Sequence, residues 1–240
     1  MNEELKQYIQ TQLFPEYAKN EEGHRIEHIN YVIERSLKFA SQVPDINMDM
    51  VYTIAAYHDI GHHIDAKNHE KVSAEMLLQD KELKKIFTEE QIKIMSEAVA
   101  DHRASSEYEP RSIYGKIVSS ADRNTDVNMV LKRTYTYTKA HNPSFTLEEI
   151  IEDSRRHIIQ KFGKDGYAIQ KMYFKDPQYE AFLATVDDLT SNKENFTKIY
   201  KEVNKINVNG VNGDGEFWQY KNKKIVWKTN FDKKIKKDMI

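Results

Sequence analysis

The sequence predicts an all-α fold, and three observations support this expectation. Only eight glycines and five prolines occur in 240 residues, so few positions interrupt a helix. Apolar residues recur at three- and four-residue spacing through most of residues 1–206, as on one face of an α-helix. Capping residues precede several of these segments. We therefore expect a helical bundle over residues 1–206 and a different structure in residues 207–240.

The first half of the chain contains six predicted helices. Their expected ranges are 2–19, 25–42, 47–61, 68–79, 89–103 and 111–122. Leu5, Ile9 and Leu13 mark the apolar face of the first helix, and similar stripes mark the others. The breakers between them are Pro44-Asp45, Gly61 and Pro110. Thr88 predicts a capping box for the fifth helix, because Gln91 follows it by three residues.

Three further helices are expected at residues 124–140, 145–162 and 177–205. Ser144 is the predicted cap of the second of these. Asp176-Pro177 begins the last, with an expected break near Ser191-Asn192. Beyond residue 206, aromatic and β-branched segments flank Lys221–Lys224, which predicts a small basic β-hairpin-like tail. Such a tail could contact nucleic acid, but a solvated surface hairpin is the favoured interpretation.

Composition excludes several classes of site and partner. The formal net charge of −2 gives no general attraction to nucleic acid or anionic membranes. No cysteine is present, so a metal site must use His, Asp and Glu. The N-terminal residues do not resemble a signal peptide, and no apolar run reaches the length of a membrane span. We expect a cytoplasmic protein with a small-molecule partner; whether it forms a homodimer stays open.

Four residues suggest a metal site. His58 and Asp59 follow an apolar helical stripe, which places an imidazole and a carboxylate side by side. A core histidine bonded to a carbonyl is the alternative interpretation of this pair. His28 begins the second helix, and Asp122 ends the sixth. A carboxylate at a helix C-terminus needs a counter-charge, which a metal or Arg123 could supply.

Other histidines extend this set. His69 precedes the fourth helix and His102 ends the fifth, so either could bind a second metal or a substrate phosphate. A helix cap or a core histidine explains each of them equally well. His24 could share a helix face with His28. His62 and His63 could assist substrate binding or proton transfer, or they could be an exposed pair in a loop. We expect His141 and His157 to be inert.

The order of these residues resembles the HD-domain metal-dependent phosphohydrolase superfamily, and in particular its small bacterial hydrolases. The resemblance covers residues 20–205 and rests on Gly23-His24-x-x-x-His28-Ile29, Ala55–Gly61 and Lys116–Arg123. It implies a helical HD-domain bundle in which His28, His58, Asp59 and Asp122 bind a divalent Mn, Fe, Co, Ni, Zn or Mg ion. His69 and His102 match two histidines that other members use for a second ion or for phosphate.

Three differences between this sequence and other members of the family narrow the range of expected substrates. Ile60-Gly61-His62-His63 follows the His-Asp pair, where (p)ppGpp hydrolases have Glu-Asp. A Gly-Tyr-Pro signature is also absent, which disfavours a cyclic di-GMP phosphodiesterase. A catalytic acid that follows the pair in some nucleotidases is missing as well. The expected reaction is hydrolysis of a phosphoester or phosphoanhydride, with a nucleotide as the favoured substrate.

The expected mechanism assigns catalytic roles to Asp59, His69 and His102. The metal would lower the pKa of a water molecule, and Asp59 would orient or deprotonate it. Phosphate oxygens also need cations. The expected phosphate-binding residues are Arg25, Arg103, Lys116 and Arg123, with Arg103 and Arg123 preferred and structural ion pairs as the alternative. Tyr135, Tyr137 and Tyr167 could stack on a base or belong to the core.

Two other interpretations remain open. A non-catalytic HD-fold module could bind a nucleotide or a protein, although such a relic would be expected to lose ligands. A di-iron oxygenase of the same fold would use more histidines and carboxylates than this set.

Overall fold

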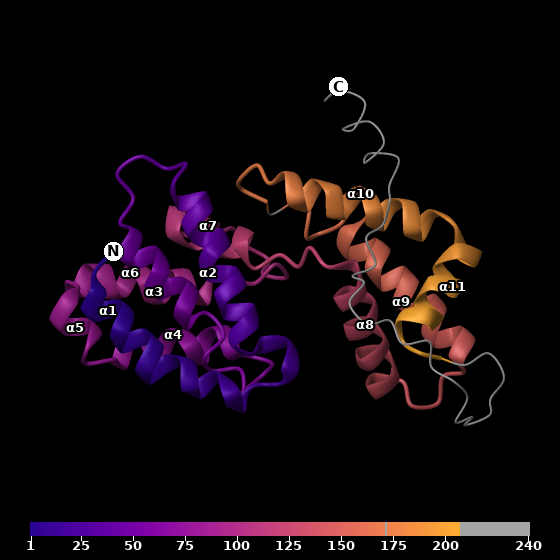
Figure 1. The fold of residues 1–240 in the computed structure, drawn as a ribbon, viewed down its shortest axis with the longest axis horizontal. Coiled ribbons are helices and arrows are strands. Elements are labelled where there is room, and N and C mark those ends of the chain that lie inside the picture. The colour runs from indigo at the N-terminus through magenta and orange to yellow at the C-terminus, as the bar shows by residue number, and fades with distance from the viewer. Residues whose placement is uncertain (171, 207–240) are drawn as a thin grey trace, which may run out of the picture. The chain divides into compact units, whose positions relative to one another are not determined.

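Helices are the only regular structure in residues 1–170 and 172–206, the part of the chain that the computed structural model describes (Figure 1). These residues belong to one compact unit, Met1–Ile206. The all-α expectation is thus confirmed for this part of the chain. The predicted hairpin-like tail of residues 207–240 lies outside the described residues. No described helix is both long and apolar enough to cross a membrane.

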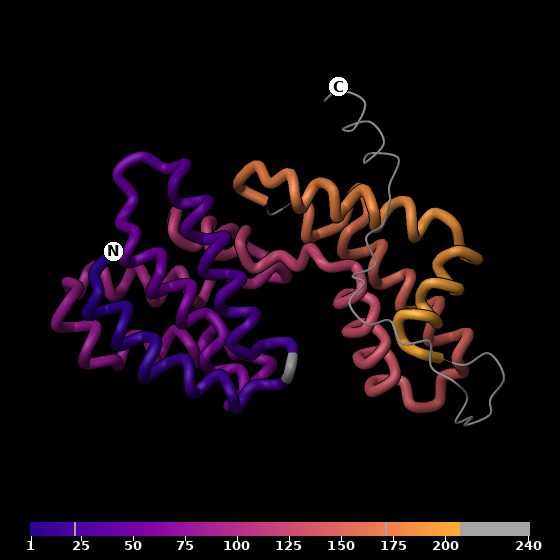
Figure 2. Tube along the Cα trace, in the orientation of Figure 1, coloured from indigo at the N-terminus to yellow at the C-terminus, as the bar shows by residue number. Residues whose placement is uncertain are grey.

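The N-terminal segment is helical but is not one α-helix. It consists of α1 (Glu3–Tyr8), a π-helical turn η1 (Ile9–Leu13) and a 3-10 helix η2 (Phe14–Lys19). Pro15 lies in the first turn of η2 and has no N–H group, so it cannot continue an α-helical hydrogen-bond ladder. The predicted apolar face is nevertheless buried, from Leu5 and Ile9 to Tyr17. Figure 2 traces this path into the short 3-10 helix η3 (Glu22–His24).

Six α-helices follow and enclose the first core. They are α2 (Ile26–Ala40), α3 (Met48–Tyr57), α4 (His69–Gln79), α5 (Leu83–Ile86), α6 (Glu89–Ala100) and α7 (Ile113–Ala121). Five were predicted; α5 is too short to show a period. Helix α3 is central, because every residue from Met50 to Tyr57 is buried and α2, α6 and α7 all pack on it.

The helix ends show which capping predictions hold. Thr88 and Gln91 form the predicted capping box of α6. Helix α7 starts after Ser112, whose side chain accepts from Gly115 N, instead of at Pro110. Ser144 is not the cap of α9 (Leu147–Phe162); Thr146 is, because Glu149 lies at the position that completes a capping box. Helix α2 ends at Ala40, before the predicted break at Pro44-Asp45, and Asp45 has a φ of 55°.

The last four helices build a second core. They are α8 (Val127–His141), α9, α10 (Pro177–Ser191) and α11 (Lys193–Val203). Its buried residues are mostly aliphatic, and several aromatic side chains, including Phe162, Phe182 and Phe196, pack among them. The predicted break near residue 191 is confirmed, because the Asn192 side chain caps α11.

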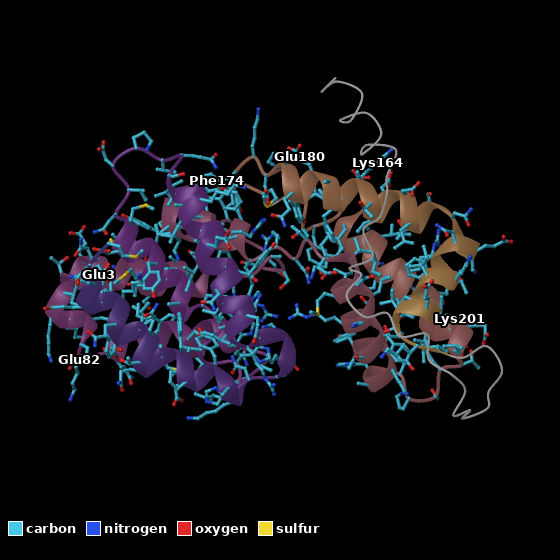
Figure 3. All side chains as sticks on the ribbon, in the orientation of Figure 1. Glu3, Glu82, Lys164, Phe174, Glu180 and Lys201 are labelled. Carbon is cyan, nitrogen blue, oxygen red and sulfur yellow. The ribbon has the colours of Figure 1, made fainter. Side chains whose placement is uncertain are left out.

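Arg35 ties the two cores together at the end of α7. Its Nε donates to Ala121 O at 3.0 Å and its Nη2 to Ser120 O at 3.4 Å. The same Nη2 lies 2.7 Å from the buried carboxylate of Asp176, the N-cap of α10. Nearby, Phe174 stacks on Phe39 with ring centroids 5.3 Å apart (Figure 3). Arg35 therefore places a positive charge at the α7 C-terminus, where the helix dipole is negative.

We predict that Arg35→Met lowers the free energy of unfolding by about 3–5 kcal/mol, because it leaves the Asp176 carboxylate buried without its partner. The control is Arg156→Met, which removes an exposed pair with Asp153 within α9 and should cost about 0–1 kcal/mol. Denaturant unfolding of the three proteins measures both values. Equal losses would show that Arg35 is not the tie between the cores.

Candidate metal centre

Five histidines surround one buried carboxylate, and each lies at or near the end of a different helix. His24 ends η3, and His28 lies in the first turn of α2. His58 follows the last residue of α3, His69 begins α4 and His102 follows α6. The carboxylate is that of Asp59, which is only 2% exposed. Asp122 joins the cluster as the C-cap of α7.

The two oxygens of Asp59 face different histidines. Oδ2 lies 2.8 Å from His24 Nδ1, 3.5 Å from His28 Nε2 and 3.3 Å from His58 Nε2. Oδ1 lies 3.1 Å from His69 Nε2 and 3.6 Å from His102 Nε2. Oδ1 is enclosed, yet it accepts no hydrogen bond from any described residue. A buried carboxylate oxygen in this state needs a positive partner, because burial removes its hydration.

Backbone carbonyls fix the protons on three of these rings. The Nδ1 atom of His58 lies 2.8 Å from Ala55 O, and those of His69 and His102 lie 3.0 and 2.7 Å from the carbonyls three residues before them. A carbonyl only accepts, so Nδ1 carries the proton and Nε2 of a neutral ring presents a lone pair. The Nε2 atoms of His69 and His102 are 3.3 Å apart. Two facing lone pairs beside a carboxylate repel unless a cation lies between them.

The spacing of these atoms suits a metal ion. Ligands bound at about 2.1 Å lie about 3.0 Å apart along an octahedral edge and about 3.4 Å apart along a tetrahedral one. The facing nitrogens and the nearest Asp59 contacts fall in or close to this range. Four sets of described side chains have suitable atoms within 4.8 Å of one another, and two of them contain the predicted ligands: His28, His58 and Asp122, and Asp59, His69 and His102.

Without a metal, protons on the histidines partly compensate the negative charges of Asp59 and Asp122. Burial lowers the pKa of His28, but hydrogen bonds and charge attraction from Asp122 and Asp59 outweigh it and raise this pKa to about 9. The contact with Asp122 is 3.2 Å. Burial raises the pKa of Asp59, yet the surrounding imidazoles hold it well below its usual range. The site therefore attracts positive charge strongly, whether it comes as protons or as metal ions.

The turn after α3 aims the His-Asp pair. The predicted helix 47–61 ends at Tyr57 instead, and residues 58–64 continue as turns with bonds such as His62 N to Asp59 O. Asn20, which sequence patterns did not single out, donates to the carbonyls of both Asp59 and His24 at 3.0 Å. Gly61 permits this turn to approach α4, because a Cβ there would lie 2.7 Å from Val72 Cγ1.

A cavity of about 510 Å³ opens beside the cluster. Among the predicted phosphate-binding residues, Arg103 and Arg123 line it, whereas Arg25 and Lys116 do not. The Arg25 Nε instead donates to Asn20 O, and Lys116 pairs with Glu109 at 3.0 Å on the surface.

The two arginines that line the cavity also have protein partners. Arg103 donates to Lys67 O at 2.6 Å and lies 3.1 Å from Glu70, so it reaches the cavity with one charge partner already bound. Arg123 is buried and donates to Ser119 Oγ. The cavity is also lined by two cationic side chains outside the predicted set, Arg133 and Lys161.

The other candidate side chains take different positions. His62 stacks on His24 with ring centroids 4.0 Å apart, and His63 Nδ1 lies 3.2 Å from Asn20 Oδ1. Tyr167 lines the cavity, whereas Tyr135 packs edge-on against Tyr200 in the second core.

A family model and a solved structure are similar to parts of this chain. Residues 25–125 match a family model described as HD domain, and no protein of curated function matches the sequence. One similar solved structure is the crystal structure of a predicted HD superfamily hydrolase from an uncultured Thermotogales bacterium, with 22% identity, a TM-score of 0.42, and coverage of 66% of this chain and 87% of that one. The matched span, residues 25–125, holds His28, the His58-Asp59 pair and Asp122, so this part of the chain is similar to HD domains.

Proposed function

We propose that this protein is a metal-dependent phosphohydrolase that cleaves a phosphoester or phosphoanhydride bond, with a nucleotide as its substrate. The observation that carries the proposal is the enclosure of Asp59 by five imidazoles, three of which turn an Nε2 lone pair toward it. This donor set favours a divalent ion over a purely structural network. The absence of cysteine suits a reducing compartment, so we place the reaction in the cytoplasm.

The ligands divide into two groups that share Asp59. His28, His58, Asp59 Oδ2 and Asp122 would hold one ion, and Asp59 Oδ1, His69 and His102 would hold a second. Imidazole and carboxylate donors accept Mn, Fe, Co, Ni or Zn, and less readily Mg. Such an ion, when bound, activates a water molecule and polarises a phosphoryl oxygen.

The protein's own side chains supply the remaining functions. Asp59 is held deprotonated by the surrounding imidazoles, so it can orient the attacking water by accepting a hydrogen bond from it. His69 and His102 keep their Nε2 atoms directed at the reaction centre through bonds from Nδ1 to carbonyls. Arg103 and Arg123 line the cavity and can neutralise phosphate oxygens.

His58→Ala should abolish metal binding at the first group and reduce hydrolysis by more than about 100-fold, because His58 is fully buried and supplies one of the ligand nitrogens of this group. The control is His141→Ala, which removes an exposed histidine that does not line the cavity. Metal content by mass spectrometry and turnover of phosphoesters and nucleoside triphosphates, with Mn²⁺, Co²⁺, Ni²⁺ or Mg²⁺ added, are the measurements.

The same panel separates the alternatives. Full hydrolysis by His58→Ala would refute the metal mechanism. Metal binding without turnover of any phosphorylated compound would favour the non-catalytic binding module instead. Oxygen consumption with bound iron would point to the oxygenase variant.

Metal affinity should increase with pH between about 6 and 8. Below its raised pKa of about 9, His28 holds a proton that an incoming ion must displace. Binding is therefore coupled to proton release, and the association constant should rise up to tenfold per pH unit for each proton displaced. Calorimetric titration with Mn²⁺ in buffers of different ionisation enthalpy counts the protons. An affinity that is constant over this range would contradict the role of His28 as a ligand.

A further inference from the structure

A second, smaller cavity adjoins the first. It has a volume of about 190 Å³ and shares four lining residues with the larger cavity: Asn124, Arg133, Lys161 and Phe162. Arg133 belongs to α8, and Lys161 belongs to the last turn of α9. The two cavities therefore meet at a boundary that carries two cationic side chains.

Lys161 is a costly residue at this position. Burial lowers its pKa, and the nearby charges of Arg123 and Arg133 oppose its charge further. The charge of Asp122 attracts it, and its Nζ lies over the Phe162 ring, 5.2 Å from the ring centroid, but no ion pair joins it to a described carboxylate. Lys161 is half-buried, and a cation withdrawn from water beside other cations is destabilising unless an anion completes the site. Lys161 thus fits a site that an anionic ligand would occupy.

Arg133 has a fixed position beside it. Its guanidinium donates to Gly23 O, directly before His24 of the metal cluster. The guanidinium packs so closely on Gly23 that a Cβ there would lie 2.3 Å from Nη2. Glycine at position 23 therefore lets the arginine lie against the chain, at the rim that the two cavities share.

The walls of the second cavity are mostly apolar and aromatic, unlike the cationic boundary. Val130, Ile158 and Phe162 supply apolar surface. Tyr137 and His157 also line it, with ring planes within 23° of parallel and centroids 6.1 Å apart. Nearly parallel rings beside aliphatic side chains suit a flat organic group.

We propose that Lys161 and Arg133 bind the phosphates beyond the one attacked, and that the second cavity takes the base of a nucleoside di- or triphosphate. This inference rests on the proposed function and deepens it, because it names the polyphosphorylated class of nucleotide. It predicts discrimination against compounds with a single phosphate. It also assigns substrate selection to α8 and α9, outside the matched HD-domain residues 25–125.

The first test compares Lys161→Met with Lys164→Met, an exposed lysine three residues later (Figure 3). With adenosine triphosphate as the probe, Lys161→Met should raise KM about 10- to 100-fold, as expected for the loss of one charge-assisted contact. Hydrolysis of p-nitrophenyl phosphate should stay within about twofold, and Lys161→Arg should restore most of the affinity. Equal KM values for the two methionine variants would overturn the proposal.

Binding provides a readout that needs no turnover. A non-hydrolysable adenosine triphosphate analogue and inorganic tripolyphosphate are titrated into each variant by calorimetry. Lys161→Met should weaken both ligands. Tyr137→Ala should weaken only the nucleotide, whereas Tyr108→Ala, at an exposed tyrosine outside both cavities, should weaken neither.

The two proposals fail in different ways. If the wild-type protein binds the analogue through Lys161 but hydrolyses nothing, the subsite stands and the phosphohydrolase proposal falls. If it hydrolyses phosphoesters while Lys161→Met and Tyr137→Ala bind the analogue as wild type does, the subsite is refuted and the proposed function stands.

Discussion

The burial of one carboxylate among five imidazoles is the constraint on which the rest of the structure depends. Asp59 is 2% exposed, and its Oδ1 accepts no hydrogen bond from the described residues. A charge in this environment is stable only if positive partners are held around it at short range. His58, His69 and His102 bond Nδ1 to backbone carbonyls, so their Nε2 atoms are free to bind a metal ion, which would supply the positive partner.

This constraint explains how the helices are organised. Each histidine and Asp122 lies at or near the end of a helix or turn, so small changes in helix position would move the ligand atoms apart. The fully buried α3 fixes His58, and close packing of Gly61 on α4 fixes the turn that carries Asp59. Arg35 holds the end of α7, and thereby Asp122, through the carbonyls of Ser120 and Ala121.

The sequence predicted the helices and the four motif residues, because period and residue type are local properties. It predicted α3 to be longer than it is, since the turn at Asp59 depends on Asn20, which is distant in sequence. The partners of Arg25 and Lys116 were likewise invisible, because nearness to a motif in sequence does not decide where a long side chain points. Arg133 and Lys161 carry no motif, and only the folded chain places them beside the cavity. That these site residues bind a metal ion stays a prediction.

The most direct test of the metal centre is anomalous X-ray diffraction from crystals grown with Mn²⁺, recorded on both sides of the metal's absorption edge. The account predicts one peak among His28, His58 and Asp122, and a second among Asp59, His69 and His102. The first peak should vanish in crystals of His58→Ala grown in the same way. An ordered cluster without any anomalous peak, in which protons alone join the imidazoles to Asp59, would contradict it.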